Sequence, residues 1–310
     1  MSLRLAVVGA GRMGSVHLDA LRDARRAHAV AVVEPHPPAR EAASARGLAT
    51  YPDVDALLDA GGFDAVLIAA PSDLHVALVA RFAAARVPVL CEKPCGLRAD
   101  ETRAAAAAAA AAGVLLQVGY WRRFVPELVA LRERLATGAL GDVSRIACWQ
   151  WDAEPPPASF RVRSGGIAVD MGVHELDQAR WLTGQEIEVV DAVAATLPSA
   201  PPVDGDPESV EAIACLSGGS VAAISLGRRF PHGDCCWLEV MGTRGYERIE
   251  FMWGAAGEVV FRRAMTAQAD AFADAVLGDG PARGASADDA ARALAAAEQL
   301  SAAIAARLEA

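Results

Sequence analysis

Lys93 is the only lysine in a chain that contains 29 lysine and arginine residues. It lies in the segment VLCEKPCGL, and arginine fills all the other lysine or arginine positions. A guanidinium stays protonated at any workable pH, whereas an ammonium can release a proton when its site shifts its pKa. Chance could leave one lysine in such a chain. A compact, titratable amine is also what a reaction centre uses, so we take Lys93 as a candidate catalytic residue.

A second group of candidates lies in the segment VDMGVHELD, where Asp170, His174 and Asp177 follow one another at intervals of four and three residues. On a helix, these spacings place the three side chains on one face. A histidine beside a carboxylate can act as a general base, because the carboxylate orients the imidazole and supports its protonated form. An ion pair on a solvated face is the alternative. The preceding Gly165 and Gly166 favour a ligand site, since glycines let the backbone approach a ligand closely.

A dinucleotide-binding pattern opens the chain. Gly9, Gly11 and Gly14 form G-x-G-x-x-G directly after the apolar segment 5–8. The first glycine permits a tight turn, the second lets the backbone approach a pyrophosphate, and the third packs helix on strand. Glu34 ends the next apolar segment, where its carboxylate can accept hydrogen bonds from the adenosine ribose and would repel a 2′-phosphate. The pattern predicts NAD rather than NADP as the cofactor.

Apolar segments alternate with helical patterns along the first third of the chain, which predicts a parallel, doubly wound sheet. Ligands bind at the carboxyl ends of the strands in such sheets. Ala70 ends one predicted strand and Pro71 and His75 follow it, whereas Glu92 and Lys93 follow another, so all five are placed at the ligand-binding edge. A helix cap is the alternative for His75. The pattern predicts strands at 63–70, 87–91 and 114–120, and helices at 53–60, 74–85 and 99–112.

The pattern changes after Tyr120. Short alternating segments dominate from residue 188 onward, and glycine-containing turns separate them, which predicts an open and antiparallel sheet. No covering helix is evident for every face of that sheet, so we expect one face to be buried between subunits. The pattern predicts strands at 143–151, 188–196, 210–215, 220–226, 237–241, 246–251 and 258–263, and helices at 126–137, 167–184, 266–277 and 286–307.

Composition and charge exclude several classes of protein. A net charge of −10 and a pI of about 5.1 argue against a nucleic acid or an anionic membrane as partner. The chain enters an apolar strand at once, without a signal peptide, and no apolar stretch is long enough to span a bilayer. We therefore expect a soluble, cytoplasmic protein. The six cysteines lack metal-ligand spacing, which predicts buried free thiols and no metal site.

Seven segments resemble, in order, the motifs of the glucose–fructose oxidoreductase, inositol 2-dehydrogenase and MocA family: VVGAGRMG, AAPSDLH, CEKP, VGYWRRF, GALGDV, SGGIAVDMGVHELDQARWLTG and LEVMGTRG. The resemblance implies an α/β fold with an N-terminal Rossmann domain over 1–120 and a C-terminal α/β domain over 121–310, whose open, mostly antiparallel sheet commonly mediates oligomerisation. It maps the family's catalytic trio onto Lys93, Asp170 and His174.

The dinucleotide pattern, the places of residues after the predicted strands and the catalytic trio together give two sets of expected binding residues. The cofactor set is Gly9, Gly11, Arg12, Met13, Gly14, Glu34, Ala70, Pro71, His75 and Glu92. The substrate set is Lys93, Tyr120, Arg122, Asp170, His174 and Asp177.

The expected function is that of an NAD(H)-dependent dehydrogenase acting on a secondary hydroxyl of a cyclic polyol or sugar, with inositol-like compounds first. A non-catalytic, nucleotide-sensing regulator of the same fold and an NAD-using glycosidase remain alternatives. The expected assembly is a homodimer or homotetramer. Substrate charge stays open: a sugar acid is favoured if several loop arginines face the site, and a neutral polyol if they are solvated. These arginines are Arg161, Arg163, Arg228 and Arg229.

Overall fold

The computed structural model describes residues 1–197 and 206–308 and divides the chain into two compact units. The first unit contains Met1–Gly96, Asp100–Phe124 and Arg262–Ala291. The second is formed by the other described residues, chiefly those from 125 to 261 and from 292 to 308. Arg262–Ala291, from late in the chain, therefore completes the N-terminal unit. A single boundary near residue 120 does not describe this arrangement.

The sheet of the first unit has the strand order β13-β6-β5-β4-β1-β2-β3. Neighbouring strands are parallel except for β13 beside β6. The order from β3 to β6 is that of a Rossmann fold, as predicted, and it reverses between β1 and β4, where such folds bind ligands. The strands are β1 (Leu3–Val8), β2 (Ala27–Val33), β3 (Ala49–Tyr51), β4 (Ala65–Ile68), β5 (Val89–Glu92), β6 (Leu116–Gly119) and β13 (Ala285–Ser286).

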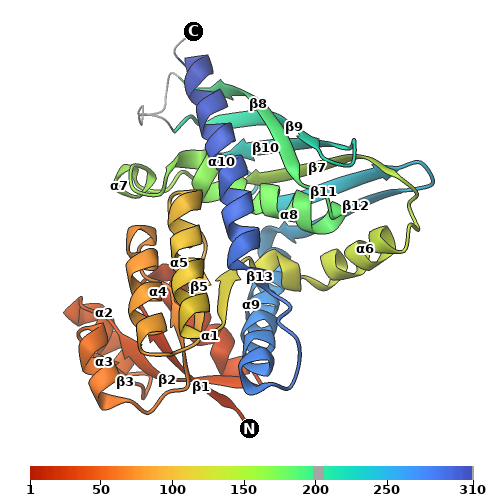
Figure 1. Cartoon of the computed structure of the whole chain (residues 1–310). Coiled ribbons are helices and arrows are strands. Elements are labelled where there is room, and N and C mark those ends of the chain that lie inside the picture. The colour runs from red at the N-terminus through yellow and green to blue at the C-terminus, as the bar shows by residue number, and fades with distance from the viewer. Residues whose placement is uncertain (198–205, 309–310) are drawn as a thin grey trace. The chain divides into compact units, whose positions relative to one another are not determined.

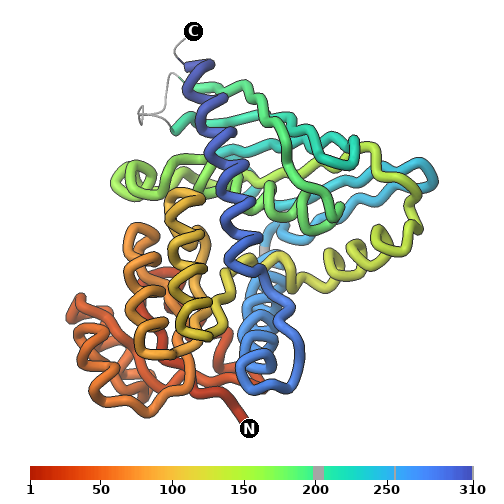
Figure 2. Tube along the Cα trace, in the orientation of Figure 1, coloured from red at the N-terminus to blue at the C-terminus, as the bar shows by residue number. Residues whose placement is uncertain are grey.

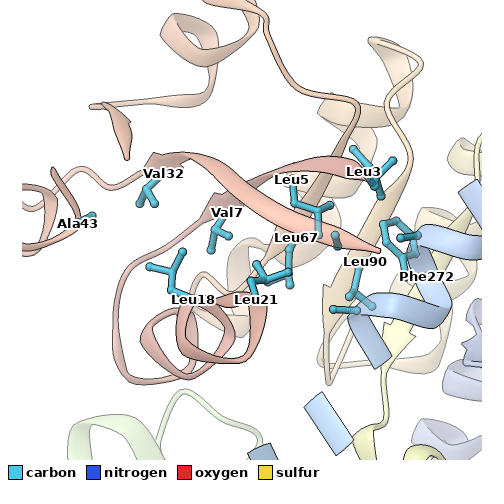
Figure 3. Packing of buried hydrophobic residues seen from close by; sticks show 14 residues of the cluster. Leu3, Leu5, Val7, Leu18, Leu21, Val32, Ala43, Leu67, Leu90 and Phe272 are labelled. Atoms are coloured by element: carbon cyan, nitrogen blue, oxygen red, sulfur yellow. The ribbon is translucent and has the colours of Figure 1, made fainter. Parts of the chain in front are cut away.

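Helices of the first unit pack on this sheet. Figure 3 shows Leu5 and Leu67 of the strands packed with Leu18 and Leu21 of the first helix. Every residue of β4 and β5 is buried, as expected for a parallel sheet that is covered on both faces. The helical elements are α1 (Arg12–Asp23), α2 (Pro37–Ser44), α3 (Val54–Ala60), η1 (Ser72–Leu74), α4 (His75–Ala84), α5 (Ala99–Ala112) and η2 (Trp121–Phe124).

Helix α9 (Gly254–Leu277) begins in the second unit and ends in the first. Its C-terminal part lies beside N-terminal elements, as the blue and red segments of Figure 2 show. The Thr266 hydroxyl donates to the carbonyl of Ala20 in α1, and Phe272 belongs to the core of the first unit. The strand predicted over 258–263 is wrong, because α9 covers these residues.

The sheet of the second unit has the strand order β12-β11-β7-β10-β9-β8, and Figure 1 shows its strands spread side by side. Every pairing is antiparallel except that of β10 with β7, which confirms the predicted open, mostly antiparallel sheet. Its strands are β7 (Val143–Trp151), β8 (Ile187–Ala195), β9 (Ser209–Leu216), β10 (Val221–Gly227), β11 (Cys235–Gly242) and β12 (Tyr246–Trp253).

Helix α8 (Val173–Thr183) packs on one face of this sheet, where the Gln178 amide donates to Cys148 Sγ of β7 at 3.2 Å. The π-helical turn η3 (Ala168–Gly172) leads into α8. A Cβ atom at Gly172 would lie 3.0 Å from Leu300, so α10 (Ala287–Leu308) also packs closely on this turn. The unit further contains α6 (Pro126–Ala136) and the short α7 (Ala158–Arg161).

The opposite face of the sheet carries exposed apolar side chains. Residues that lie directly opposite one another on paired strands point to the same face of the sheet. The pairings therefore define rows of side chains that cross the sheet from β8 to β12. Val193 is 65% exposed and Ile213 is 60% exposed, and the rings of Trp149 and Trp237 stack on the same face. We call this surface the exposed sheet face and define it by Val189, Val193, Ile213, Val221, Met241 and Tyr246.

All six cysteines are free thiols; Cys215 of β9 is exposed, and the others are buried as predicted. Within residues 1–197 and 206–308, no group of three or more His, Cys, Asp or Glu side chains could hold a metal ion. No helix in this described part of the chain has both the length and the apolar character that crossing a bilayer requires.

Candidate active site

The glycine-rich turn follows β1, whose last residue, Val8, lies opposite Ile68 of β4. The backbone of Gly9 has φ +94°, and a Cβ atom there would lie 2.7 Å from the Ala69 carbonyl oxygen. A Cβ atom at Gly14 would lie 2.0 Å from the Gly9 carbonyl oxygen. Both positions therefore require glycine, and they hold the turn and the start of α1 against the end of β4.

Gly11 differs from its neighbours, because a Cβ atom there would have no protein atom within 4 Å. It immediately precedes α1, and no side chain caps that end of the helix. The N–H groups of the first helical turn, beginning with Arg12 and Met13, have no partners within the helix. Open space in front of such a helix start fits the pyrophosphate of a dinucleotide.

Glu34 follows β2 and lies beside this turn. Its carboxylate accepts hydrogen bonds from the backbone N–H groups of Ala10, at 2.8 Å, and His36, at 2.9 Å, and the residue is buried. A carboxylate oxygen can accept more than one hydrogen bond, so capacity remains for ribose hydroxyls. A 2′-phosphate would meet a fixed negative charge. The guanidinium of Arg40 donates to the backbone carbonyls of Glu34 and Pro35.

Glu92, the last residue of β5, is held by α1. Its Oε1 atom lies 2.6 Å from Nε2 of His17, and its Oε2 atom accepts the Lys93 backbone N–H at 3.1 Å. Burial alone would raise the pKa of the Glu92 carboxyl, but the hydrogen bond and charge of His17, together with the charges of Lys93 and His75, lower it overall. The carboxylate is therefore engaged within the protein, and its predicted contact with the cofactor stays a prediction.

The residue after Lys93 is anchored as well. Nδ1 of His75 lies 2.7 Å from the Pro94 carbonyl oxygen, and Nε2 of His75 lies 2.8 Å from the Ala70 carbonyl oxygen. His75 is almost fully buried, so these contacts connect the loops after β4 and β5. Two buried histidines thus fix the backbone around Lys93: His17 acts through Glu92, and His75 acts through the Pro94 carbonyl. The sequence predicted this function for neither histidine.

The second unit contains the other predicted catalytic residues. Asp170 lies in the π-helical turn η3, whereas His174 and Asp177 lie in α8. The sequence predicted one regular helix through all three; the structure instead inserts a π-helical turn, an irregularity that is frequent at functional sites. His174 and Asp177 are buried. Gly165 and Gly166 have φ of +82° and +73°, values that few other residues adopt.

Arg228 follows β10 and is completely buried. Its Nη1 atom donates to Oδ2 of Asp170 at 2.9 Å and lies 3.5 Å from the Asp152 carboxylate, and its Nη2 atom donates to Asp206 at 3.3 Å. Burial alone would lower the pKa of the Arg228 guanidinium, but the charges of Asp170, Asp206 and Asp152 raise it overall. Arg228 is therefore a buried partner of Asp170 and not a solvated surface cation.

Arg161 and Arg229 extend the same group of charges. Arg161 is buried and pairs with the carboxylates of Asp206 and Glu208. Arg229 is exposed and pairs with Glu208 at 3.1 Å. Three of the four loop arginines thus bind carboxylates of this chain.

Tyr120 and Arg122, predicted to bind substrate, follow β6 in the first unit and are almost fully buried. The Arg122 guanidinium lies 5.8 Å from the ring centroid of Trp121. A substrate contact of either residue stays a prediction.

Two family models match most of the chain. The model described as an oxidoreductase family with an NAD-binding Rossmann fold matches residues 3–120, and the model of the GFO/IDH/MocA C-terminal domain matches residues 128–247. The chain belongs to the GFO/IDH/MocA oxidoreductase family. The resemblance read from the sequence motifs is thereby confirmed.

Named members of the GFO/IDH/MocA family are similar over most of their length. The rhizopine catabolism protein MocA of Rhizobium meliloti is 47% identical over 95% of this chain and 93% of its own. An inositol 2-dehydrogenase of Rhizobium meliloti (strain 1021) is 37% identical over 79% of this chain and 74% of its own. The scyllo-inositol dehydrogenase of Lactobacillus casei, solved with NAD(H) and scyllo-inositol, has a TM-score of 0.90 and 26% identity over 99% of this chain and 98% of its own.

Family membership and the glycine-rich turn together establish the cofactor and the general activity: this protein is an NAD-dependent oxidoreductase. From the sequence, His17 was not identified as a site residue, and Arg228 was considered only as one of the arginines that would favour an acidic substrate, not as the partner of Asp170. His17 follows Gly14 by three residues on α1, a spacing that turns it toward the sheet. Arg228 directly follows an apolar strand. These positions were the available signals in the sequence. They do not identify Glu92, 75 residues from His17, or Asp170, 58 residues from Arg228, as the partners.

Proposed function

We propose that this enzyme oxidises a secondary hydroxyl group of a cyclic polyol, with inositol-like compounds as the first choice. The observation that carries the proposal is the similarity, over 99% of the chain, to a scyllo-inositol dehydrogenase solved with NAD(H) and scyllo-inositol. The chain also keeps Lys93, Asp170 and His174 at the positions that the family motifs assign to the catalytic trio.

Each member of the trio has a separate role in the proposal. NAD, when bound, supplies the acceptor for the hydride. His174 takes the hydroxyl proton, because histidine ordinarily titrates near neutral pH. The Lys93 ammonium donates a hydrogen bond to the reacting oxygen and stabilises its developing negative charge. Asp170 orients the groups that exchange protons, and Asp177 accepts a hydrogen bond from a second substrate hydroxyl.

The cofactor set is proposed on the geometry of the first unit. Backbone N–H groups at the start of α1 bind the pyrophosphate in the space in front of Gly11, and Glu34 binds the adenosine ribose. His75 supports this edge of the sheet through its contacts with the loops after β4 and β5. The full proposed set is Gly9, Gly11, Arg12, Met13, Gly14, Glu34, Ala70, Pro71, His75 and Glu92.

A neutral substrate is favoured over a sugar acid. Arg161 and Arg228 are buried and paired with carboxylates of this chain, and Arg229 pairs with Glu208. A guanidinium engaged in this way is poorly suited to bind a substrate carboxylate, because the pairing would have to be broken and a buried carboxylate left without its partner. The arginines that made an acidic substrate plausible from the sequence therefore support a polyol.

The enzyme is also proposed to form a homodimer or homotetramer through the exposed sheet face. Exposed apolar side chains that gather on one face of a sheet favour an interaction site over free surface. The exposed face extends from β8 to β12. A second copy of the chain would cover it with an equivalent apolar surface.

A substrate panel tests the proposal. Purified enzyme with NAD is offered inositol stereoisomers, an aldose, the corresponding uronate and a glycoside, and NADH formation is followed by absorbance. We expect the largest kcat/KM with an inositol and a much smaller value with the uronate. Release of an aglycone without net NADH would instead indicate a glycosidase. NAD binding without turnover on any compound would indicate a regulator.

A further inference from the structure

We propose that Arg228 is a positioning residue for the reaction, which keeps the Asp170 carboxylate ionised and in a fixed orientation. The inference rests on the proposed catalytic role of Asp170. Arg228 is completely buried, so it acts through Asp170 and not on the substrate itself. An arginine is suited to this task, because its charge does not titrate and its planar group can hold two carboxylates at once.

Strand register explains why the charged residues meet. Gly227, the last residue of β10, lies opposite the last residue of β7 and the first residue of β9. The residues just beyond these strand ends are therefore neighbours: the Asp152 N–H donates to the Gly227 carbonyl, and the Arg228 N–H donates to the Glu208 carbonyl, both at 2.9 Å. The backbone of Arg228 is thus fixed at one end of the central strands.

The side-chain contacts direct Arg228 toward Asp170. The bond from Nη1 of Arg228 to Oδ2 of Asp170 is 2.9 Å long, whereas the bond from Nη2 to Asp206 is 3.3 Å. A buried guanidinium favours the ionised form of a carboxyl group that lies next to it. Charged or titratable groups near Asp170 include Arg228 itself, Asp152 and Asp206 across the guanidinium, and His174 one turn further along the chain.

A purely structural explanation would make Arg228 a partner of Asp206. Asp206 is already bound by Arg161, through both its side chain and its backbone carbonyl. The Arg161 contact therefore provides a guanidinium for Asp206 without Arg228. Asp170 receives its guanidinium contact from Arg228, and this contact is what the inference assigns to the reaction.

The test compares Arg228→Lys with Arg161→Lys. Both changes keep a cation in the same buried group of carboxylates, and both should lower the unfolding temperature because lysine cannot form the paired contacts of arginine. Arg228 donates to Asp170, whereas Arg161 donates to Asp206 and Glu208. We expect Arg228→Lys to lower kcat by about 10-fold or more with the Kd for NAD nearly unchanged, whereas Arg161→Lys keeps kcat within about threefold.

A double-mutant cycle with Asp170→Asn separates the two explanations, because a purely structural role of Arg228 would not depend on the charge of residue 170. In the Asp170→Asn background, Arg228→Lys should have almost no further effect on kcat, because the contact it removes has already lost its charge. Arg228→Gln is the second variant for the same cycle.

A kcat for Arg228→Lys equal to that of Arg161→Lys, or losses that multiply in the double variant, would overturn the inference while leaving the proposed function intact. A wild-type enzyme without polyol turnover, or a fully active Asp170→Asn variant, would overturn the proposed function and the inference with it.

Discussion

His17 Nε2 and Glu92 Oε1 lie 2.6 Å apart, although the two residues belong to α1 and β5 and are separated by 75 positions in the chain. The contact joins the helix that starts at the dinucleotide turn to the residue before Lys93. Because the other carboxylate oxygen of Glu92 accepts the Lys93 N–H, the same pair also fixes the backbone of the proposed catalytic lysine. A contact buried this deeply should affect both stability and its dependence on pH.

The first prediction concerns acid stability. The pKa of Glu92 lies below its ordinary value of 4.5, so its ionised form stabilises the fold at higher pH, and that contribution is lost as the pH falls through the lowered pKa. Glu92→Gln should therefore reduce the free energy of unfolding at neutral pH and weaken its decline below about pH 4.5. Urea unfolding at several pH values measures both effects. Glu41→Gln, the same change at an exposed position, should match wild type; identical profiles for all three proteins would contradict the prediction.

The second prediction concerns cofactor choice. NAD should bind more tightly than NADP, because a 2′-phosphate would approach the buried carboxylate of Glu34. Glu34→Gln removes the charge and should reduce the preference for NAD by about 10-fold or more, since about 1.4 kcal/mol corresponds to a factor of ten. Parallel fluorescence titrations with both cofactors measure the ratio. Glu41→Gln serves as the control, and an unchanged ratio in the Glu34 variant would remove Glu34 from cofactor selection.

Much of the first unit could be predicted from the sequence, because its signals are local. The glycine spacing, the apolar strands and the acidic residue after β2 each lie within one strand–helix repeat, and the structure places Gly9, Gly11 and Glu34 together as expected. The pairing of His17 with Glu92 could not be predicted in this way. It depends on which face of α1 meets which strand end, and that is fixed only when the sheet is assembled.

The incorrect prediction of a strand at 258–263 has a similar cause, because only local residues were considered. Val259, Val260 and Phe261 favour extended structure when they are considered alone. Buried or half-buried positions from 257 to 272 nevertheless recur every three or four residues, which is the period of a helix, and α9 follows that longer pattern. A periodic signal over many residues outweighs a short run of β-branched residues, because packing of a whole helix face contributes more than local propensity.

The third prediction concerns proton transfer. His174→Ala should lower kcat by roughly 10²–10⁴-fold, the usual effect of removing a general base, and leave NAD affinity nearly unchanged. Stopped-flow measurement of the first turnover separates this effect from slow product release. His28→Ala is a matched control, because His28 is exposed on the first unit. Near-normal turnover of the His174 variant would exclude it as the base.

The fourth prediction concerns assembly. Ile213→Lys places a charge on the exposed sheet face and should convert the expected dimer or tetramer to a smaller species in sedimentation velocity experiments. Val259→Lys introduces the same charge at an exposed position of α9, outside this face, and should leave the assembly unchanged. A wild-type protein that sediments as a 32.2 kDa monomer at micromolar concentration would contradict the proposed interface.

The most direct test of the proposed chemistry compares Lys93→Arg with Lys93→Met, measured as kcat for NAD reduction with the best polyol of the panel. A role based on charge alone would make Lys93→Arg mild. A role in which a compact amine donates to the reacting oxygen requires both variants to fail, because the larger guanidinium cannot take the same position. We predict that both bind NAD with nearly wild-type affinity and lose about 10²–10³-fold in kcat, as expected for the loss of one preorganised donor. An arginine variant within a few-fold of wild type would contradict the role assigned to Lys93.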